Sequence, residues 1–347
     1  MKAPGEILLL SCYELGHQPL AVASAAAFLE RAGFAPDVLD LSLEKLDAAK
    51  VERAKLAAIS VPMHTALRLG VKAAARLRAI NPSVRVCFFG LYAALNAEWL
   101  LGQGHADAVL GGEADEALVA LARGEGGASS VTVARLDYPV PSRARLPQVG
   151  RYARAVVNGE ERVAAAIETT RGCLHLCRHC PIPAVYDGRF FAVPLETVLA
   201  DVRALAASGV RHLTIADPDF WNGPAHARRV VEAIHAEFPA LTFDATIKVE
   251  HLLAHREMLP ALASSGCVFV VSAVESLSDR VLEILDKGHT RADVAEAFRL
   301  ARGAGIALRP SLLPFTPWST LEDYADLLEW IADEDLAGHV DPVQLSI

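Results

Sequence analysis

The stretch Glu168-Thr-Thr-Arg-Gly-Cys-Leu-His-Leu-Cys-Arg-His-Cys-Pro181 decides how the rest of the chain is interpreted. Its cysteines, Cys173, Cys177 and Cys180, have the spacing C-x3-C-x2-C and follow an apolar, strand-like run at residues 163–167. Thiolates are soft ligands that suit iron–sulfur clusters or zinc. Three thiolates on one short loop can hold three irons of a [4Fe–4S] cube. Because no fourth cysteine lies nearby, one iron would stay open to a ligand, which is typical of a catalytic metal site.

A zinc site made from these cysteines and His175 or His179 is the alternative. Zinc ribbons and fingers usually combine two paired half-sites, and this sequence has no second cysteine pair. The other cysteines lie in apolar, strand-like runs, which predicts buried packing for Cys12, Cys87 and Cys267. The cluster is therefore the favoured interpretation, and a zinc-stapled α/β binding module is the non-enzyme hypothesis.

A C-x3-C-x2-C loop after the first strand of an alternating β/α region resembles the radical S-adenosylmethionine (SAM) superfamily. The resemblance implies that Cys173, Cys177 and Cys180 hold a [4Fe–4S] cluster and that SAM chelates the fourth iron through its amino and carboxylate groups. It further implies that the reduced cluster breaks a C–S bond of SAM. Usual members release a 5′-deoxyadenosyl radical, and a few yield a 3-amino-3-carboxypropyl group instead.

Length and composition limit the class of protein. The chain has 347 residues, which suits two domains, and 52% of them are hydrophobic, enough for substantial cores. Its formal net charge of −9 argues against nucleic acid as a partner, because a phosphate-binding surface needs a basic patch. No apolar run reaches the roughly 18 residues that span a bilayer, so no membrane partner is expected. We expect a cytoplasmic protein, since thiols stay reduced there.

The first part of the chain, residues 1–123, alternates strand-like and helix-like segments, which predicts a doubly wound parallel sheet. This half resembles the flavodoxin-like cobalamin-binding domain found ahead of many radical SAM cores, so cobalamin is a possible cofactor. The family's lower-ligand signature D-x-H-x-x-G is absent: around His17, Leu15 and Leu20 replace the Asp and the Gly. The expected strands are Glu6–Ser11, Pro36–Leu41, Leu56–Val61, Val84–Phe89 and Ala108–Leu110, and the expected helices are Pro19–Ala32, Thr65–Ile80, Asn96–Gln103 and Glu113–Ala122.

Residues 124–160 are rich in turn formers and predict a linker with one short strand. From residue 161 to 347 strands and helices alternate again, which predicts a partial (β/α)6 barrel with its chemistry at the carboxyl ends of the strands. The expected strands are Val163–Ile167, His212–Ala216, Leu241–Ile247, Val268–Ser272, Ile306–Leu313 and Val343–Ile347, and the expected helices are Leu195–Ala207, Pro224–Glu237, His251–Ser264, Ser278–Leu285, Arg291–Ala304 and Leu321–Asp333.

Polar residues at the expected strand ends are candidates for SAM binding. Glu275-Ser276, followed by Lys287-Gly288-His289-Thr290, resembles the "ES…KG.T" segment of many radical SAM cores. The resemblance implies that Glu275 bonds the SAM ribose or amino group; capping a helix is the structural alternative. The remaining candidate contacts are Asp217, Ser276, Arg309 and Lys248, with a helix cap or a structural ion pair as the alternative roles.

A closer resemblance is to a small radical SAM family with a cysteine- or selenocysteine-bearing C-terminal tail. That family includes the arsinothricin-biosynthesis enzyme, so the resemblance implies transfer of the 3-amino-3-carboxypropyl group of SAM to a small acceptor such as arsenite. The family's tail has no counterpart before residue 347, which suggests a truncated chain or a divergent member. The stretches that carry this resemblance are Cys12–Pro19, Phe89–Ala93, Val109–Glu113 and Cys177–Ile182.

The alternatives are a cobalamin-dependent radical SAM methylase and a 5′-deoxyadenosyl-radical enzyme acting on a small natural product. In each case we expect a small-molecule substrate and an electron donor such as flavodoxin or ferredoxin.

Overall fold

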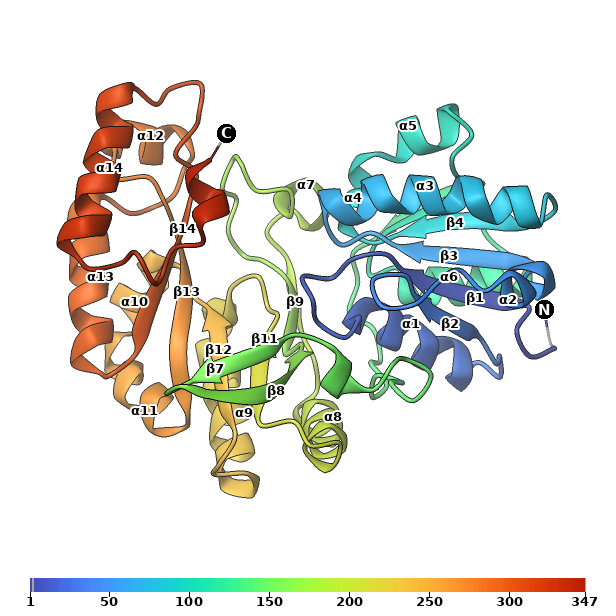
Figure 1. Cartoon of the computed structure of the whole chain (residues 1–347), viewed down its shortest axis with the longest axis horizontal. Coiled ribbons are helices and arrows are strands. Elements are labelled where there is room, and N and C mark those ends of the chain that lie inside the picture. The colour runs from blue at the N-terminus through green and yellow to red at the C-terminus, as the bar shows by residue number, and fades with distance from the viewer. Residues whose placement is uncertain (2, 347) are drawn as a thin grey trace.

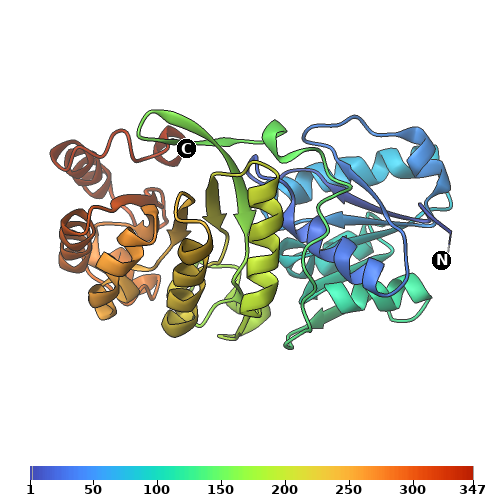
Figure 2. The ribbon, with the colours of Figure 1, turned by 90° about the horizontal axis from the view of Figure 1, so that it is seen from below.

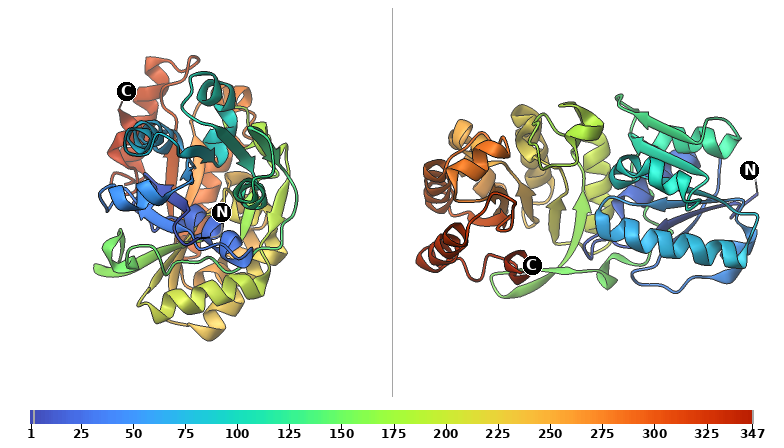
Figure 3. Two further views of the ribbon diagram at one scale, coloured as in Figure 1. Left: turned by 90° about the vertical axis from the view of Figure 1, so that its right-hand side faces the viewer. Right: turned by 90° about the horizontal axis from the view of Figure 1, so that it is seen from above.

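The computed structural model describes Met1 and residues 3–346 and shows two α/β domains arranged end to end along the long axis of the molecule (Figure 1). The N-terminal domain, in blue and cyan, is built on one six-stranded sheet, and the C-terminal domain, in green to red, on another. The right panel of Figure 3 shows the same two bodies from above. Among the described residues, no helix combines the length and the apolar character that crossing a membrane needs.

The N-terminal sheet has the strand order β2-β1-β3-β4-β5-β6, and all its neighbouring strands are parallel. Alternate residues of β1 point to opposite faces, so Ile7 and Leu9 pack toward α1 and α6, while Leu8 and Leu10 pack toward α3. Burial of both faces explains why the strands read as continuous apolar runs. The strands are β1 Ile7–Ser11, β2 Asp37–Asp40, β3 Leu56–Ser60, β4 Arg85–Phe89, β5 Ala108–Gly112 and β6 Ser129–Thr132, and the helices are α1 Leu20–Arg31, α2 Ala48–Arg53, α3 His64–Ile80, α4 Leu91–Leu95, α5 Ala97–Gly102 and α6 Asp115–Arg123.

The predicted doubly wound parallel sheet is confirmed. The linker, residues 124–160, contains two short strands where the sequence predicts one: β6, which adds to the edge of the N-terminal sheet beside β5, and Arg154–Val157, which pairs with the C-terminal sheet. The linker also ties the domains together, because Arg143 pairs with Asp201 of the C-terminal domain at 2.8 Å and donates to Gln18 of the N-terminal domain at 3.1 Å.

The C-terminal sheet has the order β14-β13-β12-β11-β8-β7, in which β7 is antiparallel to β8 and the remaining neighbours are parallel. The sheet curls into the predicted partial barrel, and α8 and α9 lie side by side along it in Figure 2. The strands are β7 Arg154–Val157, β8 Glu160–Ile167, β9 Thr170–Gly172, β10 Phe190–Ala192, β11 His212–Ile215, β12 Thr242–Thr246, β13 Cys267–Glu275 and β14 Ala307–Leu312. The helices are α7 Pro183–Tyr186, α8 Leu195–Ala207, α9 Pro224–Glu237, α10 Val249–Ala254, α11 Leu259–Ser264, α12 Asp279–Ile284, α13 Arg291–Gly303 and α14 Leu321–Asp333, with short 3₁₀ turns at Val149–Arg151, Phe220–Asn222, Arg256–Met258 and Pro342–Leu345.

The prediction of a last strand at Val343–Ile347 is wrong. Residues 342–345 form a 3₁₀ turn, and Ile347 lies outside the described residues. Pro342 has no N–H for a strand ladder, and the Asp341 carboxylate accepts from the N–H of Val343 and so favours a turn. The Gln344 side chain accepts from the N–H of Leu312 at 2.7 Å, where a sixth parallel strand would have paired with β14. The sixth strand of this sheet is instead the antiparallel β7.

Candidate functional site

The three cysteines of the C-x3-C-x2-C motif lie on the loop between β9 and α7. All three thiols are free, and Cys173 and Cys177 are buried while Cys180 is more open. Burial raises the pKa of Cys173 and of Cys180, and the charge of Cys180 acts on Cys173, so these thiols lie close enough to interact. Metal binding would deprotonate such thiols and turn them into soft ligands. This donor set, on one loop and without a competing disulfide, fits an iron–sulfur cluster.

The loop is closed at its base by a short hairpin. Strand β9 pairs with β10, and the N–H of Cys173 donates to the carbonyl of Arg189 at 3.1 Å. Gly172 has a φ of +78°, and a Cβ there would lie 2.3 Å from the Arg189 oxygen and 2.6 Å from the Tyr186 ring. Only glycine fits this turn, which directs the cysteine loop away from the hairpin.

His179 in the cysteine loop is held by the end of β13. Its Nε2 lies 3.2 Å from Oε1 of Glu275, and Lys287 donates to the same oxygen at 3.2 Å. Burial alone would raise the pKa of Glu275, but His179 and Lys287 outweigh it and lower the pKa. Glu275 also has a φ of +64°, an uncommon conformation for a residue with a side chain. The predicted SAM contact Glu275 therefore lies next to the cluster loop in a strained, charge-balanced position.

His175 in the same loop is held from the ends of β11 and β12. Lys248 lies 3.1 Å from its Nδ1 and 2.8 Å from Glu250. On the other side of the ring, Asp219 Oδ2 lies 3.2 Å from Nε2 of His175 and 2.8 Å from Nδ1 of His251. Burial pushes the pKa of Asp219 up, but the two imidazoles outweigh it and lower the pKa to about 2. Lys248, another predicted SAM contact, thus also lies next to the cysteine loop.

The other predicted SAM contacts make different interactions. Asp217 accepts from the N–H of Thr169 at 2.7 Å and from the hydroxyls of Thr169 and Thr170 at 2.5 and 2.7 Å, so both its oxygens are engaged at the base of the loop. Burial raises the pKa of Asp217 to about 7. Ser276 accepts from the N–H of Ser278 at 3.1 Å. Arg309 is exposed and stacks over the Phe269 ring at 4.0 Å. The structure therefore gathers Asp217, Lys248 and Glu275 around the loop, whereas Ser276 and Arg309 have separate partners.

Arg171 joins the cysteine loop to the N-terminal domain, a role that the sequence analysis missed. Its guanidinium contacts Asp115 at 2.7 Å, Glu113 at 3.1 Å and Glu168 at 2.7 Å, and donates to the hydroxyl of Ser24 at 2.8 Å. The only signal in the sequence is a single arginine before Gly172, and no pattern connects it to carboxylates 56 and 58 positions earlier.

Glu113 is the centre of this interdomain contact, with Tyr138 and Tyr186 as its further partners. Tyr138 and Tyr186 each donate a hydroxyl to Glu113 at 2.9 Å, one to each oxygen. Burial raises the pKa of Glu113. Helix α7, which follows the cysteine loop, also packs against α4 of the N-terminal domain (Figure 1). The carboxyl edge of the N-terminal sheet therefore borders the cysteine loop.

That edge of the N-terminal sheet has polar atoms without hydrogen bonds. Among the described residues, Oε2 of Glu14, Nδ1 of His17 and Oγ of Ser60 are buried and lack a hydrogen-bond partner. Glu14 and His17 follow β1, and Ser60 ends β3. In the order β2-β1-β3 this is the switch point at which open α/β sheets bind ligands. Buried polar groups are normally hydrogen-bonded, so these residues fit a ligand held at this edge.

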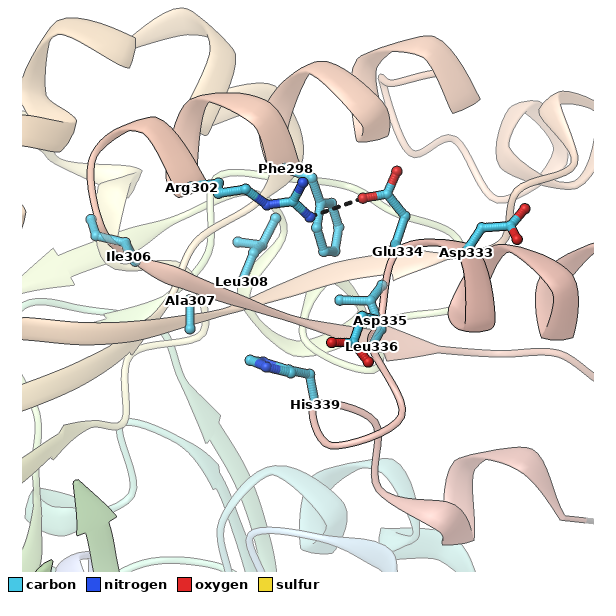
Figure 4. A pocket seen from close by; sticks show the side chains of 10 residues that line it. All are labelled: Phe298, Arg302, Ile306, Ala307, Leu308, Asp333, Glu334, Asp335, Leu336 and His339. Atoms are coloured by element: carbon cyan, nitrogen blue, oxygen red, sulfur yellow. Dashed lines mark hydrogen bonds and ion pairs between the residues drawn. The ribbon is translucent and has the colours of Figure 1, made fainter. Parts of the chain in front are cut away.

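A cavity of about 430 Å³ lies elsewhere, between α13, the start of β14 and the end of α14 (Figure 4). Arg302 and Glu334 form an ion pair at 3.0 Å across its rim, and Ile306 and Ala307 line it at the amino end of β14. Chemistry in parallel β/α folds is located at the opposite, carboxyl ends of the strands, so this cavity is not the candidate site.

Comparison with known families agrees with this division of the chain. Residues 7–122 match the family described as B12 binding domain, and residues 167–331 match the Radical SAM superfamily. The fold and the cysteine loop agree with these two matches: the chain combines a B12-binding-type domain with a radical SAM-type domain that follows it. A radical SAM domain uses a [4Fe–4S] cluster and SAM, and it needs an electron donor.

Solved structures share the arrangement of both domains. The radical SAM methyltransferase TsrM from Kitasatospora setae, with cobalamin and a [4Fe–4S] cluster bound, superposes with a TM-score of 0.73 over 95% of this chain and 70% of that chain, at 18% identity. The cobalamin-dependent SAM radical enzyme OxsB gives a TM-score of 0.70 over 94% of this chain and 51% of that chain, at 15% identity. At these identities the likeness concerns the fold.

Curated relatives match over about half of this chain. The ribosomal protein uS12 methylthiotransferase RimO of Geobacter sulfurreducens is 26% identical over 188 residues, which are 51% of this chain and 41% of that protein. The tRNA-2-methylthio-N(6)-dimethylallyladenosine synthase of Aliivibrio fischeri is 25% identical over 54% of this chain and 42% of that protein. The match therefore covers less than half of the length of these relatives.

Proposed function

We propose that this chain is a cobalamin-dependent radical SAM transferase that moves a methyl group from SAM to a small molecule. The observation that carries the proposal is the contact between the cysteine loop and the N-terminal sheet, made by Arg171 and Tyr186 with Glu113. It brings a thiolate donor set next to the edge where Glu14, His17 and Ser60 have unsatisfied polar atoms. Two cofactors bound at these edges would be neighbours. The two structural neighbours TsrM and OxsB, both solved with cobalamin bound, support the same arrangement.

The cysteines and the charged residues around them would bind different groups. Cys173, Cys177 and Cys180 would hold the cluster, which when bound supplies the electron that breaks a C–S bond of SAM. SAM carries an ammonium, a carboxylate and ribose hydroxyls. Glu275 can accept from the ammonium or the hydroxyls, and Lys248 can donate to the carboxylate. Both already lie against the cysteine loop through His179 and His175.

Two features support a small substrate and a separate electron donor. The net charge of −9 disfavours a nucleic acid. Cys180 is the most open of the three ligands, so an electron donor such as flavodoxin or ferredoxin would approach from its side. RimO, by its name, acts on a ribosomal protein. A peptide offered as methyl acceptor is therefore the control for a small-molecule substrate.

The experiment is anaerobic reconstitution with iron and sulfide, followed by SAM and reductant, with and without added hydroxocobalamin. We expect S-adenosylhomocysteine to form only with cobalamin and one cobalamin to remain bound per chain after gel filtration. Equal product formation with and without cobalamin would contradict the proposal.

The second candidate is transfer of the 3-amino-3-carboxypropyl group to trivalent arsenic, which the resemblance of four sequence stretches supports. Its marker product is 5′-deoxy-5′-methylthioadenosine, formed with arsenite as acceptor. Thiols are the natural ligands for arsenic, but Cys12, Cys87 and Cys267 are all buried in hydrophobic surroundings. Burial raises the pKa of Cys12 and of Cys87 to about 12 each. None of these three thiols offers arsenite an accessible thiolate.

A further inference from the structure

We propose that His175, Asp219 and His251 form a binding site for a divalent first-row transition-metal ion, separate from the cysteines of the cluster. The three residues come from the cysteine loop, from the segment after β11 and from α10. This proposal goes beyond the proposed function and does not depend on it, because none of the three residues belongs to the cysteine set.

The geometry of the three side chains matches a metal site. One ligand atom from each residue lies within 4.8 Å of the other two. Asp219 Oδ2 lies 2.8 Å from His251 Nδ1 and 3.2 Å from His175 Nε2. Metal–ligand bonds to imidazole and carboxylate are about 2.0–2.2 Å, which puts neighbouring ligand atoms roughly 3 Å apart. The two pairs that include Asp219 already have this spacing, whereas the two imidazole nitrogens lie within 4.8 Å of each other and would have to move closer for one ion to contact all three atoms.

The same three atoms lack hydrogen bonds. His175 Nε2, Asp219 Oδ2 and His251 Nδ1 are buried, and although the contacts are short, their directions do not satisfy a hydrogen bond. The Asp219 side chain is 4% exposed. A buried polar group without a hydrogen bond is energetically unfavourable, because it has given up water without gaining a partner. An ion at the point where the three atoms converge would satisfy all of them at once.

The donor set indicates the class of ion. Two imidazoles and one carboxylate suit Zn²⁺, Fe²⁺, Co²⁺ or Mn²⁺ and leave coordination positions open for water or another ligand. The other oxygen of the carboxylate, Asp219 Oδ1, accepts from the N–H of Trp221 at 3.1 Å, which fixes its orientation. The bound ion would tie the cysteine loop to the ends of two strands.

Lys248 affects the metal affinity of this site through the tautomer of His175. Its ammonium lies 3.1 Å from His175 Nδ1, and because an ammonium only donates, Nδ1 accepts and Nε2 carries the proton without a metal. Metal binding through Nε2 needs the other tautomer, with the proton on Nδ1. Glu250 Oε2 lies 3.9 Å from Nδ1, beyond hydrogen-bond distance, and could accept this proton only after moving closer, while Lys248 keeps its 2.8 Å contact with Glu250. Lys248→Met should therefore strengthen metal binding.

The test uses Co²⁺ as the probe on protein in which Cys173, Cys177 and Cys180 are all replaced by alanine, so that thiolates cannot compete. We expect one equivalent of Co²⁺ to bind, with d–d absorption bands and without thiolate charge-transfer bands. Asp219→Asn and His251→Gln should each weaken binding by more than the roughly 10- to 100-fold effect of losing an outer hydrogen-bond partner of a metal ligand. His255→Gln, which changes a neighbouring imidazole outside the three, should leave the affinity unchanged.

A second measurement decides the matter if the triple-alanine chain does not fold. Cluster-loaded wild-type protein should retain one zinc ion per chain after dialysis against a weak chelator, and His251→Gln should lose the zinc but keep the cluster absorption. Equal zinc content in wild-type and His251→Gln protein would overturn the proposal. If only the proposed function is wrong, the protein should still bind zinc at this site but show no cobalamin-dependent turnover.

Discussion

The carboxyl edges of the two sheets differ in the polar groups that they present. At the N-terminal edge, Glu14, His17 and Ser60 have buried polar atoms without partners. At the C-terminal edge, carboxylates such as Glu275 are paired with cations, and free thiols lie in front of them. The first edge is suited to a large ligand held by scattered polar contacts, and the second to charged groups and a metal cluster. Neither sheet alone would place two such ligands side by side, so the contact between the domains is as important as each edge.

The two buried carboxylates Glu14 and Asp219 show the same contrast. Burial raises the pKa of Glu14 to about 7 at the N-terminal edge. His175 and His251 lower the pKa of Asp219 to about 2 at the C-terminal edge, against the effect of burial. The sign of each shift thus depends on whether cations accompany the carboxylate into the interior.

The largest effect is expected at the cysteine loop. Cys177→Ala removes one of three cluster ligands, so the reconstituted protein should lose the cluster and all reductive cleavage of SAM. Iron content and mass analysis of the nucleoside products measure this. The matched control is Cys267→Ala, which removes a buried thiol from β13 and should keep both cluster and turnover. If Cys177→Ala keeps its cluster, the loop is not the cluster site.

The contact between the domains is tested by Arg171→Met. This change leaves Glu113, Asp115 and Glu168 without their shared cation, and breaking a buried ion pair typically costs about 3–5 kcal/mol. Urea unfolding should show this loss of stability. Arg203→Met, which removes an exposed ion pair with Glu237, should have no measurable effect. Equal stability of the two variants would mean that Arg171 does not hold the domains together.

The N-terminal edge should show a distinct pH dependence through Glu14. The carboxyl pKa is about 7 in the folded chain and 4.5 in the unfolded chain, so between these values the unfolded chain loses a proton that the folded chain keeps. Stability contributed by the protonated group is therefore present below pH 4.5 and is lost as pH rises through 7. Glu14→Gln should match wild type at about pH 4.5 and exceed its free energy of unfolding by up to about 3 kcal/mol at about pH 8. A difference that does not change with pH would contradict this.

The smallest effect concerns Ser60. Its buried hydroxyl has no partner, so Ser60→Ala should raise the stability of the ligand-free chain by about 1 kcal/mol. The same variant should gain less stability from added hydroxocobalamin than wild type does. Ser208→Ala serves as the control, because that hydroxyl donates to Ala204 at the surface and should give no gain. Loss of stability in Ser60→Ala would show that the hydroxyl is satisfied.

Local patterns predicted most of the fold and only part of the site. The bounds of α8, α9 and α14 agree with the sequence, because apolar spacing and turn residues mark both ends of each helix. The strand expected at Val343–Ile347 failed because a short apolar run does not reveal that Gln344 makes the contact with β14 by its side chain. Sequence spacing predicted the three cysteines as cluster ligands, and the structure places all three free thiols on one loop.

The remaining site residues depend on contacts between distant segments. The sequence placed Asp217 at a strand end but could not show that its oxygens point to Thr169 and Thr170. It likewise offered no reason to connect Arg171 with Glu113, or His175 with Asp219 and His251. Such pairings follow from how the sheets and domains pack, which no local pattern reports.

The turn at Gly172 has a practical consequence for tracing this protein's history. Backbone and ring atoms leave room there for nothing larger than a hydrogen, so a saturation library at this codon should return glycine alone among functional clones. A homologue with any other amino acid at this place must have rebuilt the hairpin beneath its sulfur ligands. The position therefore offers a simple marker for separating chains that keep this loop architecture from those that have abandoned it.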